Sequence, residues 1–338
     1  MRAEVPQTPF PIRISVALCS YNGASYIGEQ LRSLADQTRL PDELVVVDDG
    51  SADGTDEIVR EFMRGAPFPV HWHRNALNLG VARNFEKAIG LTTGDIVFLA
   101  DQDDVWVSSK VEKTLARFDA PEVLVVHTDA RLVDGALRDL GSGLLEALEF
   151  AHWERDLFSL GKGYELLLRR SIVTGATAAV RRRLFEAARP FGEGWMHDEW
   201  LALIGALLGE VRRVDEPLVL YRQHGLNQIG AQKRSWLERH LPRPVRGREL
   251  YLNRAEHLES VRGHLARKGL RVQPAREREL EEAIRHARFR ADVPEPLPAR
   301  VLSIARELKS GRYRRFSNGW KSAVRDLIQP ASALRRSR

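Results

Sequence analysis

Three carboxylates stand within four residues of this chain, at Asp101, Asp103 and Asp104. They follow a short apolar run, 96–100, which is typical of a buried parallel strand. Ligands of open α/β sheets bind beyond the carboxyl ends of such strands. Crowded acids repel one another unless a cation or hydrogen-bond donors lie among them. Asp101 and Asp103 are spaced so that both could reach one Mg²⁺ or Mn²⁺ ion. The competing interpretation is a solvated acidic loop that caps a helix beginning near Ser108.

Two further polar segments also follow predicted strands. The run 44–47 ends in Asp48 and Asp49, and the run 12–19 ends in the turn residues Ser, Tyr, Asn and Gly at 20–23. Acids therefore stand a second time where ligands of such sheets bind. Asp48 and Asp49 also fit the paired acids of a phosphoacceptor receiver. The turn that follows them and the length of the chain argue against that class.

Strand and helix patterns alternate closely over the first 230 residues, which predicts an α/β fold with a mostly parallel central sheet. The expected strands are 12–19, 44–47, 70–73, 96–100, 123–127, 174–180, 210–214 and 218–221. The expected helices include 25–37, 81–91, 108–118, 181–188 and 196–208, and residues 135–170 read as irregular and mostly helical. From residue 231 onward the patterns are only helical, at 250–267, 275–290, 299–309 and 319–328.

Charge divides the chain in the same place. The net charge of the whole chain is +6, but residues 231–338 carry 27 Lys and Arg against 12 Asp and Glu. Residues 1–230 carry 25 basic and 34 acidic residues and are therefore acidic. Such asymmetry predicts an anionic partner for the basic part. The single cysteine, Cys19, cannot form an internal disulfide, which fits a reducing compartment, and we expect neither a signal peptide nor a membrane-spanning segment.

Six motifs together resemble glycosyltransferase family two, in the order in which that family has them. Four resemble its nucleotide-sugar half: Ser20-Tyr21-Asn22-Gly23, Val47-Asp48-Asp49-Gly50-Ser51, Asn78-Leu79-Gly80-Val81-Ala82-Arg83-Asn84-Phe85 and Asp101-Gln102-Asp103-Asp104-Val105-Trp106. Two resemble the rhamnosyltransferase-like branch: His197-Asp198-Glu199-Trp200 and Tyr221-Arg222-Gln223-His224-Gly225-Leu226-Asn227. The resemblance covers residues 12–230 and implies a GT-A type nucleotide-diphospho-sugar transferase fold, followed by the helical C-terminal region.

The resemblance also implies how the donor is bound. Asp101-Gln102-Asp103 is similar to the family's DxD motif, so the implied metal ligands for Mn²⁺ or Mg²⁺ are Asp101, Asp103 and His224, with Asp103 the more direct. For His224 a structural role in a tight turn stays open. The implied nucleotide-sugar-binding residues are Ser20, Tyr21, Asn22, Asp48, Asp49, Arg83, Asp101 and Gln102. Of these, Asp49 matches the acid that accepts from a uracil or thymine ring N–H. Arg83 is equally readable as a solvated residue on a helix face.

The residues that the resemblance implies for the acceptor come from the later motifs. Asp198 matches the family's catalytic base, although it could instead only cap the helix that it opens. Glu199 would point about 100° away on that helix and would not share the role. Trp195 and Trp200 are candidates for the acceptor groove or for the core. The family more often has Glu-Asp where this chain has His197 and Asp198, so the role of His197 is open.

These observations predict an inverting, metal-dependent glycosyltransferase in which residues 1–230 are the catalytic domain and 231–338 a basic helical region. The resemblance names a dTDP- or UDP-sugar as donor, with L-rhamnose from dTDP-rhamnose as the particular candidate. The acceptor would be a hydroxyl of a bacterial surface polysaccharide or of its lipid-linked precursor. The alternative is a non-catalytic carbohydrate-binding or scaffold protein on a transferase-like fold.

The basic region has three interpretations, of which we favour membrane contact. Basic and aromatic residues interleave over 312–321, which suits an anionic membrane surface with Phe316 and Trp320 inserted. Packing on the catalytic domain or on a second subunit is the second interpretation. Nucleic acid is the third, and we expect no such partner. The predicted location is the cytoplasm, at the inner face of the cytoplasmic membrane.

Overall fold

Four parallel strands with buried faces make up the first half of the sheet. In the computed structural model, which describes residues 12–224 and 247–328, the chain begins with this half. Its strands are β1 (Ile14–Ser20), β2 (Glu43–Asp48), β3 (Val70–Arg74) and β4 (Ile96–Asp101), paired in the order β3-β2-β1-β4. Every residue of β1 and β2 is buried, as expected for strands covered on both sides. Parallel pairing brings their carboxyl ends to one edge.

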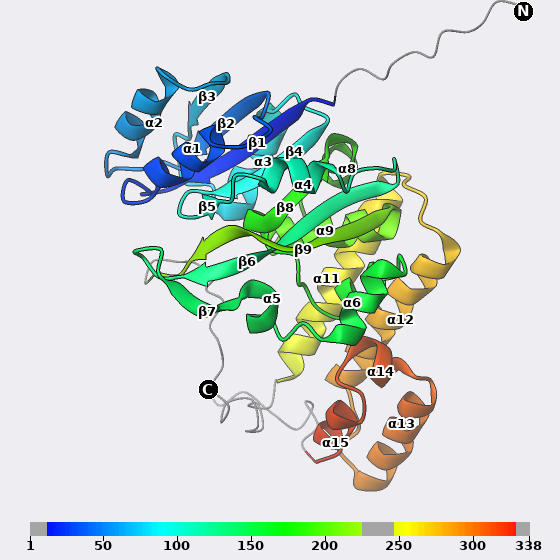
Figure 1. Ribbon diagram of the computed structural model, residues 1–338. Coiled ribbons are helices and arrows are strands. Elements are labelled where there is room, and N and C mark those ends of the chain that lie inside the picture. Colours follow the sequence, from blue (N-terminus) through cyan, green and yellow to red (C-terminus); the bar gives the residue numbers. More distant parts are fainter. Residues whose placement is uncertain (1–11, 225–246, 329–338) are drawn as a thin grey trace, which may run out of the picture.

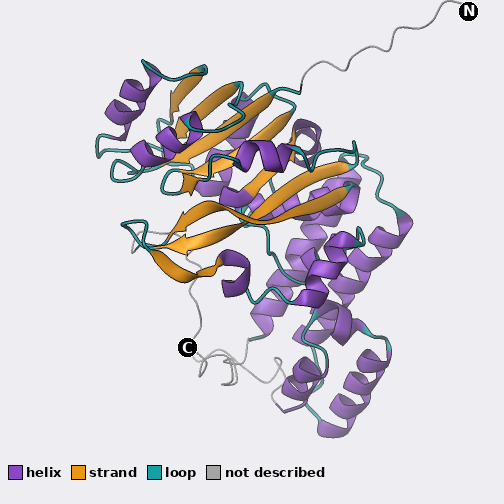
Figure 2. Ribbon diagram, viewed as in Figure 1, coloured by secondary structure: helices purple, strands orange, loops and turns teal. Residues whose placement is uncertain are grey.

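Helices cover both faces of these strands (Figures 1 and 2). On one face, α1 (Ile27–Ala35), α2 (Thr55–Met63) and α4 (Lys110–Leu115) pack on the side chains of Ile14, Val16 and Leu18. On the other face, α3 (Val81–Leu91), α8 (Arg182–Ala188) and α9 (His197–Leu208) pack on Ala17 and Cys19. The alternation follows from the two-residue period of a strand, which sends successive side chains to opposite faces.

The second half of the sheet is mixed. β8 (Ala178–Arg181) runs antiparallel between β4 and β6 (Val123–Val133), and β9 (Glu210–Arg222) is parallel to β6. β5 (Val105–Trp106) pairs with the end of β9, and β7 (Asp139–Gly143) pairs with β6. The two strands expected at 210–214 and 218–221 are therefore one strand. A register shift next to Pro217, which cannot donate to the ladder, produces the break in the pattern.

Short helices lie between β7 and β9, as the irregular pattern of 135–170 indicated. They are α5 (Leu144–Ala147), α6 (His152–Ser159), α7 (Gly163–Leu167) and the 3-10 turn η1 (Gly175–Thr177). η1 occupies the start of the strand that we expected at 174–180. The apolar helix α9 is buried along almost its whole length, since both the sheet and later helices cover it.

The C-terminal helices continue the same core. α11 (Arg248–Arg267) and α12 (Pro274–Ala291) form a hairpin whose apolar side chains, such as Val261 and Ile284, join the cluster around α9. α13 (Leu297–Lys309), α14 (Arg312–Phe316) and α15 (Trp320–Ile328) surround a smaller cluster with Tyr313 at its centre (Figure 1). The expected domain boundary at 230/231 lies outside the described residues. Among the described residues, none of the helices is both long and apolar enough to span a membrane.

One expectation for this region is wrong. Phe316 does not insert into a membrane, because it is 9% exposed and packs in the core that the helices share with the catalytic part. Trp320 is 67% exposed, as expected.

A buried ion pair between α12 and α15 gives a test of this shared packing. Arg290 donates two hydrogen bonds to Asp326, at 2.7 and 2.8 Å, and both side chains are buried. We expect Arg290→Gln to lower the free energy of unfolding by roughly 3–5 kcal/mol, because it leaves a carboxylate buried without its partner. Urea unfolding followed by circular dichroism measures this loss.

The matched control is Arg288→Gln on the same helix. Arg288 pairs with Glu259 at the surface, so its loss should cost less than about 1 kcal/mol. Equal stability of the Arg290 variant and the control would contradict the packing of α15 on α12.

Candidate active site

A cavity of about 530 Å³ opens at the carboxyl ends of β1, β2 and β4. It is lined by the loops that follow these strands, by the first turn of α9 and by the segment 171–175 before η1. The structure brings nine of the predicted residues to this cavity: Ser20, Tyr21, Asn22, Asp49, Asp101, Gln102, Asp103, Asp198 and His224. Four do not line it: Asp48, Arg83, Trp195 and Trp200. Segments from the beginning, the middle and the end of residues 1–230 therefore meet at one site.

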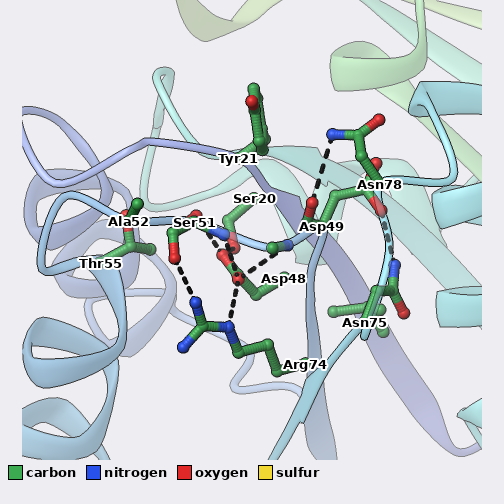
Figure 3. A network of polar contacts seen from close by, with 12 residues as sticks. Ser20, Tyr21, Asp48, Asp49, Ser51, Ala52, Thr55, Arg74, Asn75 and Asn78 are labelled. Atoms are coloured by element: carbon green, nitrogen blue, oxygen red, sulfur yellow. Dashed lines mark hydrogen bonds and ion pairs between the residues drawn. The ribbon is translucent and has the colours of Figure 1, made fainter.

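Asp48 holds a turn beneath the cavity instead of lining it (Figure 3). Its buried carboxylate accepts from Ser20 Oγ at 2.9 Å and from the backbone amides of Gly50 and Ser51 at 3.1 and 2.8 Å. Ser51 Oγ donates to it as well, and Arg74 lies 3.8 Å away. The expected contact of Asp48 with the donor is therefore wrong, since its oxygens are directed into the fold.

Asp49 lines the cavity with its carboxylate fixed. Its oxygens accept from the amides of Leu79 and Gly80 at 2.8 and 2.9 Å and from Asn75 Nδ2 at 2.7 Å. These bonds attach the loop after β3 to the end of β2. Arg83, the third residue of α3, is exposed and pairs with Glu86 at 2.6 Å. The solvated interpretation of Arg83 is the one that the structure favours.

Gln102 joins the loop after β4 to the loop after β1. Its side-chain amide accepts from the backbone N–H of Tyr21 at 2.8 Å and donates to the Tyr21 carbonyl at 3.0 Å. The Tyr21 ring stays 46% exposed at the cavity mouth, where it could stack on a flat base. Gly23 makes the close approach of the two loops possible, because a Cβ atom there would lie 2.1 Å from Gln102 Oε1.

Carboxylates crowd the floor of the cavity. Burial, together with the charges of Asp103 and Asp198, raises the pKa of Asp101 to about 8. Burial and the charges of Asp103 and Asp101 raise the pKa of Asp104. Lys110 is fully buried below them, where it donates to the carbonyl of Ala176 at 2.7 Å and lies 3.6 Å from the centre of the Trp106 ring. Burial lowers the pKa of Lys110, while Asp104 and Asp101 oppose that shift.

Asp103 and His224 meet at the mouth of the same cavity. His224 Nε2 lies 2.9 Å from Asp103 Oδ2, and the imidazole stacks on the Tyr26 ring at 4.7 Å. Arg222 holds this arrangement from the core: its Nε donates to the Asp103 carbonyl at 2.7 Å and its backbone N–H to Asp104 at 3.0 Å. The end of β9 thus fixes the loop after β4.

The donor set fits a divalent cation only in part. Among residues 12–224 and 247–328, no three His, Cys, Asp or Glu side chains are arranged to hold an ion. Asp103 and His224 are the pair that the geometry brings together. Asp101 lies in the same cavity, and the charge of Asp103 is one of the causes that raise its pKa. Mg²⁺ is usually bound by one or two carboxylates together with substrate phosphates and water, so two protein ligands suffice.

Asp198 faces this cluster from the first turn of α9. Its Oδ2 accepts from the backbone N–H of Gly175 at 2.8 Å, and its Oδ1 from the N–H of Glu199 at 2.8 Å. The residue that caps α9 is Met196, so the interpretation of Asp198 as the N-cap is wrong. Next to it, His197 is buried, stacks on the Phe85 ring at 3.8 Å and has its pKa lowered by burial.

Trp195 and Trp200 belong to the core, so their assignment to an acceptor groove is wrong. They are 4% and 1% exposed. Trp195 Nε1 donates to Ser260 Oγ of α11 at 3.0 Å, and Trp200 Nε1 donates to the Ala188 carbonyl at 2.8 Å. Buried indoles with satisfied N–H groups are packing residues. Their function is to brace α9 against the C-terminal helices.

Sequence reasoning missed the residues that orient the acids. Lys110, Gly175 and Arg222 all act on a carboxylate or its loop, and each belongs to a different segment. Arg222 belongs to one of the motifs named above. The sequence around Lys110 does not distinguish it from any other lysine at the start of a helix. Gly175 looked like a strand residue. The missing cue for Lys110 is burial, which only the packing of α4 under the loop reveals.

The comparison with protein-family models returns glycosyl transferase family 2 over residues 15–188, more than half of the chain. The chain belongs to glycosyl transferase family 2. This confirms the resemblance that its motifs indicated. The family-2 match ends before Asp198 and His224.

Characterised and uncharacterised relatives resemble it over about two thirds of its length. An uncharacterised glycosyltransferase of Nostoc is 26% identical over 223 residues, 64% of this chain and 66% of that protein. The dTDP-rhamnosyl transferase RfbG of Shigella flexneri is 24% identical over 63% of this chain and 74% of its own.

Solved structures show the same fold. TarS 1–349 of S. aureus, crystallised with UDP-GlcNAc, gives a TM-score of 0.57 at 16% identity and covers 95% of this chain and 90% of its own. The mannosyltransferase PcManGT of Pyrobaculum calidifontis, in complex with GDP-Man and Mn²⁺, gives 0.51 at 20% identity over 95% and 88%. The expected GT-A fold is confirmed.

Gly175 offers a test of the hydrogen bond that orients Asp198. A Cβ atom at this position would lie 2.5 Å from His197 Nε2, and the stacking of that ring on Phe85 leaves it little room to move. We expect Gly175→Ala to shift the amide that holds Asp198 and to lower turnover of a nucleotide sugar about 10²-fold, the usual effect of misplacing a reacting group. Donor affinity, measured by calorimetry, should stay unchanged.

The control is Gly65→Ala, since a Cβ atom there meets no atom within 4 Å. Full turnover in a folded Gly175 variant would show that this amide does not position Asp198.

Proposed function

We propose that this protein is an inverting glycosyltransferase that moves a sugar from a nucleotide diphosphate to an acceptor hydroxyl. The observation that carries the proposal is the shared cavity. Asp49 and Tyr21, which suit a nucleotide base, line the same cavity as Asp198, and the carboxylates after β4 lie between. A transferase needs a site for the nucleotide, a site for the diphosphate and a base for the acceptor in one cavity, with the last two on opposite sides of the anomeric carbon.

Asp198 acts as the general base. As the acceptor oxygen attacks the anomeric carbon, its proton passes to the Asp198 carboxylate, and the bond from that carbon to the diphosphate oxygen breaks. Attack from the face opposite to the leaving group inverts the anomeric configuration. The hydrogen bond from the Gly175 amide keeps the Asp198 carboxylate oriented.

Asp103 and His224 would hold the divalent cation. A cation held there would neutralise the negative charge that builds on the departing diphosphate. Asp101 lines the same cavity, where a bound cation would favour its charged form. A mannosyltransferase of this fold is known with GDP-Man and Mn²⁺, which supports a metal in this protein.

The donor we propose is a dTDP- or UDP-sugar, with dTDP-rhamnose as the particular candidate. The relative RfbG is named a dTDP-rhamnosyl transferase, and other relatives are named an abequosyltransferase and a teichuronic acid glycosyltransferase. These names support a hydroxyl of a bacterial surface polysaccharide, or its lipid-linked precursor, as acceptor. Synthesis on such a precursor would place the protein in the cytoplasm, at the inner face of the membrane.

The C-terminal helices carry a face that supports this location. Leu297, Val301, Leu302 and Leu308 of α13 and Val324 and Ile328 of α15 are all exposed. Arg306 and Lys309 stand beside them on α13. Exposed apolar side chains with a cationic border suit the surface of an anionic leaflet.

A non-catalytic carbohydrate-binding or scaffold protein is the alternative. Its sequence would be free to lose the acids, since burying several carboxylates near one another costs stability. This chain has Asp49, Asp101, Asp103 and Asp198 together at one cavity, which favours the enzyme.

The metal assignment predicts a defect in nucleotide binding. Asp103→Asn removes the charge of one proposed ligand, so we expect the protein to lose most of the increase in UDP or dTDP affinity that Mn²⁺ gives. Isothermal calorimetry with and without Mn²⁺ measures this increase. Glu57→Gln, on the exposed face of α2, is the matched charge control. Unchanged Mn²⁺ dependence in the Asp103 variant would exclude this residue as a ligand.

The base assignment predicts a defect in turnover alone. Asp198→Asn should lower kcat by roughly 10²–10⁴-fold, the usual contribution of a positioned base. Donor affinity should stay the same, and the neutral amide still accepts from Gly175. Nuclear magnetic resonance of the wild-type product should show inversion at the anomeric carbon. Asp156→Asn, on the exposed side of α6, is the control. A variant that turns over normally would move the role to another carboxylate, with Glu199 the first to examine.

A further inference from the structure

The C-terminal helices and the catalytic part enclose two more cavities, which adjoin one another. The inner cavity measures about 440 Å³ and the outer about 770 Å³. Both are lined by Arg169, Ser317, Asn318 and Arg325, so they adjoin one another, and we call the pair the basic trough. Its walls come from the end of α7 on one side and from α11, α12, α14 and α15 on the other. No residue assigned to donor binding lines it.

The basic trough carries positive charge in excess of what the fold neutralises. Five arginines line the inner cavity, and none of its described lining residues is Asp or Glu. Arg170 and Arg290 have carboxylate partners in Glu154 and Asp326. Arg325, which lines both cavities, forms no ion pair with any residue that the structure describes, and neither do Arg314 and Lys321 of the outer cavity.

Arg169 stands at the junction of the two cavities without a carboxylate in contact with it. Its guanidinium lies 5.2 Å from the centre of the Trp153 ring and donates to the side-chain oxygen of Asn318. Burial lowers its pKa, and the charge of Glu154 offsets only part of that shift. A guanidinium that is partly removed from water and held by neutral groups is an effective binder of a carboxylate or phosphate.

Two exposed indoles flank the outer cavity. Trp153 of α6 is 51% exposed and Trp320 of α15 is 67% exposed, and both line the cavity wall. Large aromatic rings are costly to leave in water unless they serve a contact. The flat C–H face of a pyranose ring packs on such a ring. Cations and exposed indoles in one hollow therefore suit a sugar chain that carries negative charge.

One short segment lies between the basic trough and the donor cavity. Residues 168–170 line the inner cavity, and residues 171–175, which directly follow, line the donor cavity. Arg254 of the inner cavity donates to the Leu167 and Leu168 carbonyls at the start of this segment. Burial lowers the pKa of Arg254, and the charge of Glu199, which lines the donor cavity, opposes that shift. The trough and the donor cavity are therefore neighbours on either side of this segment.

We propose that the basic trough binds the acceptor, and that the acceptor is a glycan bearing carboxylate or phosphate groups. This inference rests on the proposed transferase function and narrows its acceptor class. Arg169 and Arg325 bind the anionic groups, and Trp153 and Trp320 pack on sugar rings. Arg254 is a positioning residue that links the trough to the first turn of α9.

The test measures binding to the full-length protein with UDP and Mn²⁺ in excess, so that the donor cavity is filled. The probes are an oligogalacturonate for carboxylates, a glycerol-phosphate oligomer for phosphates, and maltohexaose as the neutral control. We expect one or both anionic probes to bind, with affinity that falls as salt rises, and maltohexaose to bind far more weakly. Which anionic probe binds more tightly distinguishes the two groups.

Variants locate the binding. Arg325→Gln should weaken the anionic probe about tenfold, the usual effect of losing one charge-assisted hydrogen bond. The matched control is Arg306→Gln, an exposed arginine of α13 that lines neither cavity and has no ion-pair partner among the described residues. Equal weakening by the two variants, or equal binding of maltohexaose, would overturn the proposal.

Two further outcomes distinguish glycan binding from membrane binding and from failure of the transferase function. If Arg325→Gln weakens binding to phosphatidylglycerol vesicles while no oligosaccharide binds, the trough contacts a membrane and the glycan proposal fails. Hydrolysis of the nucleotide sugar is measured in the same samples. Hydrolysis without binding of an anionic probe overturns only the trough, whereas the absence of both hydrolysis and donor binding overturns the transferase itself.

Discussion

Repulsion among carboxylates is the constraint on which this site depends. Asp101, Asp103 and Asp198 line one cavity and Asp104 is buried next to them, partly out of water, where like charges are costly. The fold compensates them only in part. Lys110 lies below them, Arg222 binds the loop that carries two of them, and the Gly175 amide binds Asp198. A cation bound among these carboxylates would reduce their mutual repulsion.

Contacts on both sides of the site hold these carboxylates in place. Parallel pairing fixes the ends of β1, β2 and β4, and hydrogen bonds of Asp48, Asp49 and Gln102 tie their loops together. On the other side, α9 is enclosed by the sheet and by the C-terminal hairpin of α11 and α12. The indoles of Trp195 and Trp200 transmit this support. The C-terminal helices are thus part of the machinery that orients Asp198.

The two ends of the molecule divide recognition between them. The first half of the sheet presents neutral and acidic groups to the donor, whereas the C-terminal helices present arginines and exposed indoles to the basic trough. The charge asymmetry of the sequence therefore corresponds to an acidic donor cavity and an arginine-lined trough. A donor that binds through a cation and an acceptor that binds through anions can occupy the molecule together without competing.

The sequence by itself determined the strands of the first half, the family, and the acids at strand ends, because these are local: an apolar run and a polar stop lie within ten residues. It also indicated Asp198 and His224 through their motifs. Only the tertiary structure decided which polar residues face the cavity. Asp48 points inward, Arg83 points to solvent, and Trp195 and Trp200 are core, although each stands in or next to a motif. Orientation of this kind depends on packing between segments that are far apart in the sequence, such as α9 and α11 or β9 and the loop after β4, and no local pattern encodes it.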